Sequence, residues 1–205
     1  MKETDIYSEL NSIRSIMERS TKFISLSGLS GVLAGIYALT GAFIGYNIIY
    51  KDGNELGGSQ LYIDASNGYK IVLTAIIILA VSILTGFILS INQSKKLGQN
   101  FWNAGSRRLF GSLAIPLVVG GLFLLILMYN GDFQYIAPTC LIFYGLALVS
   151  GSQFTYSDVK YLGFLEIILG FICAIFPGYG IIFWAIGFGV LHILYGTIMH
   201  LKYKQ

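Results

Sequence analysis

Apolar residues gather in six long stretches separated by short polar connections, and this alternation dominates the chain. The stretches cover residues 24–46, 70–91, 109–129, 134–151, 161–176 and 180–201. At 1.5 Å of rise per residue, most of them are long enough to cross a hydrocarbon core about 30 Å thick. Glu166 is the one charged residue that falls inside a stretch rather than at its edge. The pattern therefore predicts an all-α, polytopic membrane bundle of six transmembrane helices.

The first 22 residues differ in character from the rest, so we divide the chain into a cytoplasmic or interfacial segment (1–22) and a transmembrane domain (23–205). Within residues 4–22, apolar side chains recur at spacings of four, three and four, which predicts an amphipathic helix. This helix either lies on the inner leaflet and leads into the first span, or docks against a partner or a second copy. The second reading arises because the same stripe also fits a short coiled-coil seam.

Lysine and arginine are distributed unevenly between the two sets of connections. Only Lys51 and Lys70, of 13 such residues, fall on the side opposite the termini. Because cytoplasmic loops collect positive charge, we expect both termini in the cytoplasm and the protein in the cell (inner) membrane. The basic 92–108 connection also carries Phe101 and Trp102, a combination typical of contact with anionic headgroups. Membrane lipids are therefore the expected partner, and nucleic acid is not.

Small residues form a continuous stripe along the first span, at spacings of three or four. The stripe consists of Gly28, Gly31, Gly35, Ala38, Gly41 and Gly45. Lipid gives no hydrophobic drive for two helices to associate, so association depends on the close packing that small residues permit. We expect the stripe to be buried, either against another span of the same chain or across a homo-oligomer interface. The alternative is that its glycines line a pore or a substrate path.

The last two spans carry the candidate polar site, which consists of Glu166, His192 and Tyr195. An ionisable group inside a span is energetically costly and is by default a functional hypothesis. The 161–176 and 180–201 stretches are joined by about three residues, so they must be antiparallel neighbours, and Glu166 can meet His192 in the inner half of the bundle. Tyr195 shares a helix face with His192. The pair either relays protons or holds a polar ligand, or it simply satisfies two buried polar groups.

No pattern in the chain indicates an enzyme, a cofactor or a metal site. His192 and His200 lie two turns apart on one helix, about 12 Å, so they cannot share a metal ion. A phosphate-binding loop, a nucleophile elbow and paired zinc ligands are all missing from the sequence. Cys140 and Cys173 fall inside spans, where thiols are expected to be inert core residues.

The last hairpin, YLGFLEIILGFICAIFPGYGIIFWAIGFGVLHILYG, has glycines among aliphatic residues and a proline at its turn. In these features it resembles the corresponding hairpin of the small six-span bacterial acid-resistance membrane protein family. The resemblance covers about forty residues, and neither of the other two hairpins has a proline that matches Pro177 in its turn. It implies a non-enzymatic inner-membrane protein.

Three classes of function follow from these patterns. The expected class is a non-enzymatic integral membrane protein with a sensing, stress-related or assembly role. The first alternative is a transporter or channel for protons or a small solute, which would use Glu166 and His192. The second alternative is a membrane-embedded enzyme acting on lipid, for which the chain has few polar side chains. A water-accessible cavity at Glu166 would favour transport, and a dry packed core would favour the first class; the sequence indicates no particular small-molecule ligand.

Overall fold

A computed structural model describes residues 22–23, 27–50, 55–58 and 63–203. Its helices are α2 (Gly28–Tyr50), α3 (Ala65–Lys96), α4 (Ala104–Asn130), α5 (Ile136–Gly151), α6 (Val159–Ile175), α7 (Gly180–Trp184) and α8 (His192–Lys202). Short 3-10 segments, η1 (Phe133–Tyr135) and η2 (Ser152–Phe154), flank α5, and a π-helical segment, η3 (Ala185–Leu191), joins α7 to α8. The described residues contain no strand, which confirms the predicted all-α class. The predicted amphipathic helix of residues 4–22 lies outside them, except for Lys22.

Five helical runs are long and apolar enough to cross a membrane. They are Gly28–Tyr50, Ser66–Lys96, Ala104–Asn130, Phe133–Phe154 and Gly180–Lys202. The fifth predicted span, α6, has 17 residues and is only about 25 Å long at helical rise. The most apolar window of α3 contains no buried residue, and large side chains such as Ile76 and Leu84 face outward. A soluble protein rarely exposes an apolar face of this extent, and an acyl-chain environment accounts for it.

The predicted connection over 92–108 is shorter than expected, because helices extend into it from both sides. Helix α3 continues to Lys96, and α4 begins at Ala104. Asn103 starts α4 with a capping box, in which its side chain accepts from the Ser106 N–H at 2.9 Å and Ser106 Oγ accepts from the Asn103 N–H at 2.9 Å. The basic residues of this region therefore lie in the terminal turns of two helices rather than in a loop.

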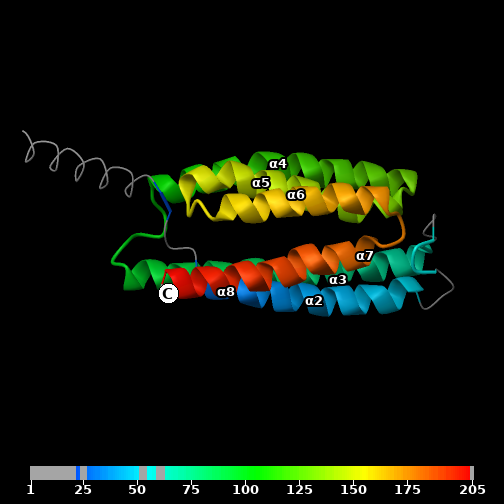
Figure 1. Cartoon of the computed structure of the whole chain (residues 1–205), viewed down its shortest axis with the longest axis horizontal. Helices are drawn as coiled ribbons and strands as arrows, with labels where there is room; N and C mark the ends of the chain where they lie inside the picture. The colour runs from blue at the N-terminus through cyan, green and yellow to red at the C-terminus, as the bar shows by residue number, and fades with distance from the viewer. Residues whose placement is uncertain (1–21, 24–26, 51–54, 59–62, 204–205) are drawn as a thin grey trace, which may run out of the picture.

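The helices are arranged in two layers (Figure 1). Helices α2, α3 and the α7–η3–α8 run form one layer, and α4, α5 and α6 form the other. The first helix of the described bundle therefore packs beside the last, although they lie at opposite ends of the sequence. Contacts between the layers are made mainly by α7 and η3 against α5 and α6. We refer to the two groups as the α2/α3/α8 layer and the α4/α5/α6 layer.

Backbones meet at glycines within each layer. A Cβ atom added to Gly35 would lie 2.6 Å from the Gly189 carbonyl oxygen, so α2 and η3 touch through their main chains. In the other layer, a Cβ on Gly145 would lie 2.6 Å from the Gly163 carbonyl oxygen, and one on Gly163 would lie 2.8 Å from the Gly145 carbonyl oxygen. Such close approach is the packing mode expected where lipid surrounds the helices.

The glycine stripe of the first span is largely covered within the chain. Gly28, Gly35, Ala38, Gly41 and Gly45 are buried, and Gly31 is half-buried. Its first half lies against η3 and α8, where a Cβ on Gly28 would come within 2.7 Å of the Gly196 carbonyl oxygen. Its second half meets only side chains, Ile78 of α3 and Ile181 of α7. The stripe is thus explained without a second copy, and a homo-oligomer stays a prediction.

The layers are also tied together at both ends of the bundle. Where α8 ends, Asp158 of the α5–α6 turn accepts from Lys202 Nζ at 2.7 Å and from the Tyr203 hydroxyl at 2.9 Å. The Lys202 ammonium holds the pKa of the Asp158 carboxyl below its usual value. At the opposite end, the Tyr50 hydroxyl donates to the carbonyl of Gly178, in the α6–α7 turn, at 2.7 Å.

One end of the bundle is basic, and we call it the basic end. It carries Lys22, Lys95, Lys96, Arg107, Arg108, Lys160 and Lys202, with Asp158 as its described acid. At the opposite end the described charges are Glu55, Asp64, Lys70 and Asp132. The uneven distribution of charge along the sequence is therefore also a difference in charge between the two ends of the folded bundle.

The glycine contacts predict a graded response to leucine. Gly35→Leu should destabilise the protein most, by about 1–3 kcal/mol or more, because a side chain would separate two backbones. Gly41→Leu should cost less, because its neighbour is the flexible side chain of Ile78, with the nearest atom 3.0 Å from an added Cβ. Gly86→Leu is the control, since a Cβ there meets nothing within 4 Å. Thermal unfolding in detergent measures the series, and equal losses at all three positions would contradict the packing described.

Candidate functional site

Glu166 lies at the junction of the two layers. It is the eighth of the 17 residues of α6, about 10 Å along the axis from the start of the helix. The predicted stretch begins at residue 161, whereas α6 begins at Val159, so Glu166 lies two residues further from the start of its helix than the stretch implied. The side chain is completely buried, with 0% of its surface exposed. Helix α6 therefore carries a carboxyl group to the middle of an apolar bundle.

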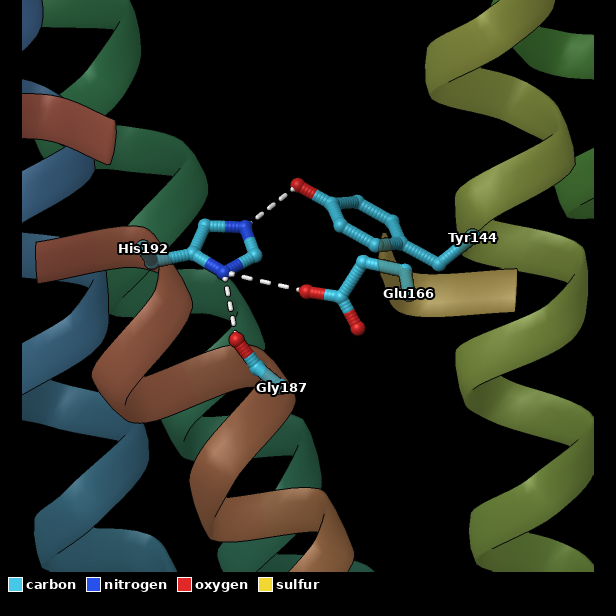
Figure 2. A network of polar contacts seen from close by, with 4 residues as sticks. All are labelled: Tyr144, Glu166, Gly187 and His192. Atoms are coloured by element: carbon cyan, nitrogen blue, oxygen red, sulfur yellow. Dashed lines mark hydrogen bonds and ion pairs between the residues drawn. The ribbon is translucent and has the colours of Figure 1, made fainter. Parts of the chain in front are cut away.

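His192 faces Glu166 from the other layer (Figure 2). Its Nδ1 atom lies 3.0 Å from the Gly187 carbonyl oxygen and 3.5 Å from Glu166 Oε1. Its Nε2 atom lies 2.7 Å from the hydroxyl of Tyr144, which α5 supplies. Because a carbonyl oxygen can only accept, Nδ1 carries the proton in the Gly187 contact, and a neutral ring then accepts from Tyr144 at Nε2. Both ring nitrogens are therefore satisfied without Glu166.

Glu166, by contrast, has no hydrogen bond among the described residues to either carboxyl oxygen. The separation from His192 is an ion-pair distance, longer than a hydrogen bond. Its other oxygen lies over Gly187, where an added Cβ would come within 2.5 Å of Oε2. Glycine at this position lets the carboxyl approach the π-helical backbone. Burial of a polar group without a partner is unfavourable, so this carboxyl lowers the free energy of unfolding instead of raising it.

Aromatic rings surround the His192 side. Phe188 lies between Trp184 and His192, with ring centroids 5.2 Å from the former and 6.0 Å from the latter. Tyr144 packs against both Phe188, at 5.0 Å, and His192, at 5.4 Å. Phe188 therefore connects the His192 ring to Trp184 through ring contacts.

Tyr195, the third predicted site residue, lies one turn beyond His192 on α8. Its hydroxyl is buried and has no hydrogen-bond partner among the described residues. The structure thus brings Glu166 and His192 together at the junction and places Tyr195 one turn further along α8, toward the basic end, without a hydrogen bond to either of them among the described residues. Whether the three act in a function stays a prediction.

Two members of the site were missed by sequence reasoning. Tyr144 lies at mid-span rather than at the headgroup level where tyrosines usually occur, and that position was the available indication. The Gly187 carbonyl could not have been found, because its place depends on the π-helical segment. A π-helical turn within an α-helix is rare and often occurs at a functional site.

The described residues contain no group of three His, Cys, Asp or Glu side chains close enough to hold a metal ion. The site instead offers one carboxyl, one imidazole and one phenol in a chain. Such groups exchange protons, and the Tyr144 hydroxyl lies 2.7 Å from His192 Nε2, a distance at which a proton can pass between them. The chemistry available to these residues is proton binding and proton transfer.

Comparisons with protein-family models, with curated proteins and with solved structures find no match to this chain. The resemblance of the last hairpin to the acid-resistance family therefore stays a prediction. Function has to be argued from the site itself.

The absence of hydrogen bonds to Glu166 predicts that the fold does not need it. Glu166→Met keeps the side-chain length and removes the ionisable carboxyl, so we expect unchanged stability or a gain of about 1–4 kcal/mol. Thermal unfolding of the variant in detergent, beside Glu166→Gln, measures this. A loss of about 3–5 kcal/mol, as when a stabilising buried ion pair is broken, would show that Glu166 is structural.

Proposed function

We propose that this protein is a non-enzymatic, multi-pass membrane protein that senses protons through Glu166. The observation that supports it is a fully buried carboxyl with no hydrogen bond among the described residues, beside a histidine already satisfied by other groups. Because such a residue lowers the stability of the fold, we infer that it is present for a function. Gaining or losing one proton is the change open to it.

The proposal includes six crossings of the cell membrane, with both termini in the cytoplasm. Helix α6, fifth in chain order, would be added to the other five spans as a shorter one, and it packs along α5 over its length. The basic end of the bundle would face the cytoplasm, because positive charge is retained there. Its exposed Lys95, Lys96, Arg107 and Arg108 would lie at the level of anionic lipid headgroups.

The junction gives proton binding a mechanical consequence. With a proton on Glu166, both sides of the junction are neutral and His192 donates to Gly187. Loss of that proton leaves a buried carboxylate, which is strongly unfavourable without a partner. His192 Nδ1 lies 3.5 Å from Glu166 Oε1. Its N–H can then exchange the hydrogen bond to the Gly187 carbonyl for one to Glu166 Oε1. Such a shift draws α6 toward η3 and changes the fit of the two layers.

Sensing is favoured over transport because the carboxyl oxygens of Glu166 are inaccessible. A transporter needs the carboxyl to meet both aqueous phases in turn. The transport alternative retains one supporting observation, the Tyr144–His192–Glu166 chain, which has the composition of a proton relay. A lipid-acting enzyme is not supported by any contact of the site.

Trp184 provides a test, because its ring is coupled to His192 through Phe188. In a Trp102→Phe background, Trp184 is the remaining tryptophan, and we expect its fluorescence to change with pH along a curve for one proton. Glu166→Gln keeps the shape and removes the titrating group, so the change should be lost. Tyr161→Phe is the control, because Tyr161 is an exposed residue of α6, the helix that also carries Glu166.

An unchanged titration in Glu166→Gln would overturn the proposal. Proton flux into proteoliposomes, followed with a pH-sensitive dye, separates the two classes. Flux above that of empty liposomes, lost in Glu166→Gln, would establish transport in place of sensing.

A further inference from the structure

Phe23, the first residue after the N-terminal segment, is bonded to the layer that does not contain α2. Its backbone N–H donates to the Phe154 carbonyl at 2.7 Å, and its carbonyl accepts from the Thr155 hydroxyl at 2.8 Å. Phe154 ends η2 and Thr155 follows it, in the connection between α5 and α6. Helix α2 begins five residues after Phe23, at Gly28, and belongs to the other layer. The chain therefore joins the two layers before it enters the first span.

We call the two hydrogen bonds of Phe23 the Phe23 tie, and burial protects it from water. Phe23 is 1% exposed and Thr155 is 2% exposed. The Phe23 ring also meets Phe101, in the connection between α3 and α4, edge to face at 5.4 Å between centroids. The Asp158–Lys202 contact at the same end is an exposed ion pair, and such pairs contribute little to stability. The Phe23 tie is therefore the firmer of the two links between the layers at the basic end.

The connection that holds Phe23 is continuous with α6. Backbone hydrogen bonds join the first turn of α6 to the residues before it, from Val159 to Tyr156, from Lys160 to Ser157 and from Tyr161 to Asp158. Glu166 follows Val159 by seven residues in the same helix. A displacement of α6 toward η3, which we propose for ionised Glu166, therefore also displaces the connection to which Phe23 is bonded.

The other side of the tie is held by a different layer. Helix α2 packs on η3 through the backbone contact of Gly35 with Gly189, so it stays with its own layer when α6 moves. The Phe23 N–H lies 2.7 Å from the Phe154 carbonyl oxygen, and hydrogen bonds of this kind rarely exceed about 3.2 Å. A displacement of about 0.5 Å between the layers takes the tie to that limit.

We propose that the Phe23 tie is a strap controlled by Glu166. With a proton on Glu166 the tie is closed and holds the end of the N-terminal segment, residues 1–22, at the connection before α6. When Glu166 is ionised, the change in the fit of the layers opens the tie and releases the segment. This inference rests on the proposed proton sensing and adds the part of the chain that responds to it.

The groups that could titrate around this path can be told apart. Those that face Glu166 are Tyr144 from α5 and His192 from α8. Next to the tie, the connection carries Asp158, whose pKa the Lys202 ammonium holds below its usual value. Asp158 is therefore ionised throughout the neutral range, and a response there that depends on Glu166 does not come from it.

The test is deuterium uptake by peptides that contain the Phe23 amide, in the otherwise native protein in detergent. The wild type is compared with Glu166→Gln at the same pD, so that the intrinsic exchange rate is equal and a difference reports local opening. At the acid end of the Trp184 titration, the two proteins should exchange alike. At the alkaline end the wild type should exchange faster, because the variant has no carboxyl to ionise.

A variant of the tie separates the strap from the sensor. Thr155→Val keeps the side-chain shape and removes the hydroxyl that donates to Phe23, so exchange at the acid end should rise toward the alkaline level. The Trp184 titration should keep its amplitude and midpoint. Thr155→Ser retains a hydroxyl and should behave as the wild type. Thr197→Val is the control, because the exposed Thr197 hydroxyl bonds within α8, to the Ile193 carbonyl at 2.7 Å.

The outcomes distinguish the strap from the proton sensing on which it rests. Equal exchange by the wild type and Glu166→Gln at the alkaline end, with the Trp184 response intact, would overturn the strap and leave sensing intact. So would a dependence on pH that persists unchanged in Thr155→Val. A wild-type protein with no Trp184 response dependent on Glu166 would overturn both.

Discussion

Contact between helix backbones at glycines is the constraint on which the rest of this structure depends. Main chains meet where Gly35 lies on Gly189 and where Gly145 lies on Gly163, and these contacts build the two layers. Among the described residues no such backbone seam joins the two layers along their length. Helices α5 and α6 instead contact α7 and η3, and Tyr144 of α5 contacts His192 of α8 through its side chain. A polar group placed there can alter the fit of the layers without breaking either of them.

Glu166 occupies that position, where a buried carboxyl without a hydrogen bond among the described residues lowers the stability of the fold. Its environment combines a glycine that admits the carboxyl, a histidine held by two other partners, and a π-helical segment whose carbonyl can be released. Each feature would be unnecessary if the carboxyl only filled space. The proposed switch requires two arrangements of this junction that differ by the place of one proton, and these features supply the groups for both.

The sequence predicted the helical class and the proximity of Glu166 to His192 for physical reasons that hold locally. Apolar length dictates helices in lipid, and a short turn makes the last two helices neighbours. It could not predict that α8 packs on α2, because glycine-rich helices are interchangeable by composition. Nor could it predict the Gly187 carbonyl as a partner of His192, since a π-helical segment comes from a shift in backbone hydrogen bonding. Tyr144 could have been predicted as a site residue, because it places a hydroxyl group at mid-span.

Infrared difference spectroscopy tests the central claim most directly, because a protonated carboxyl and a carboxylate absorb at different frequencies. Reconstituted protein would be compared between alkaline and acid pH, with Glu166→Gln as the reference. The account predicts one carboxylic acid C=O band that appears as the pH falls and is missing from the variant. A wild-type protein whose Glu166 band is the same at every pH at which it remains folded would contradict it.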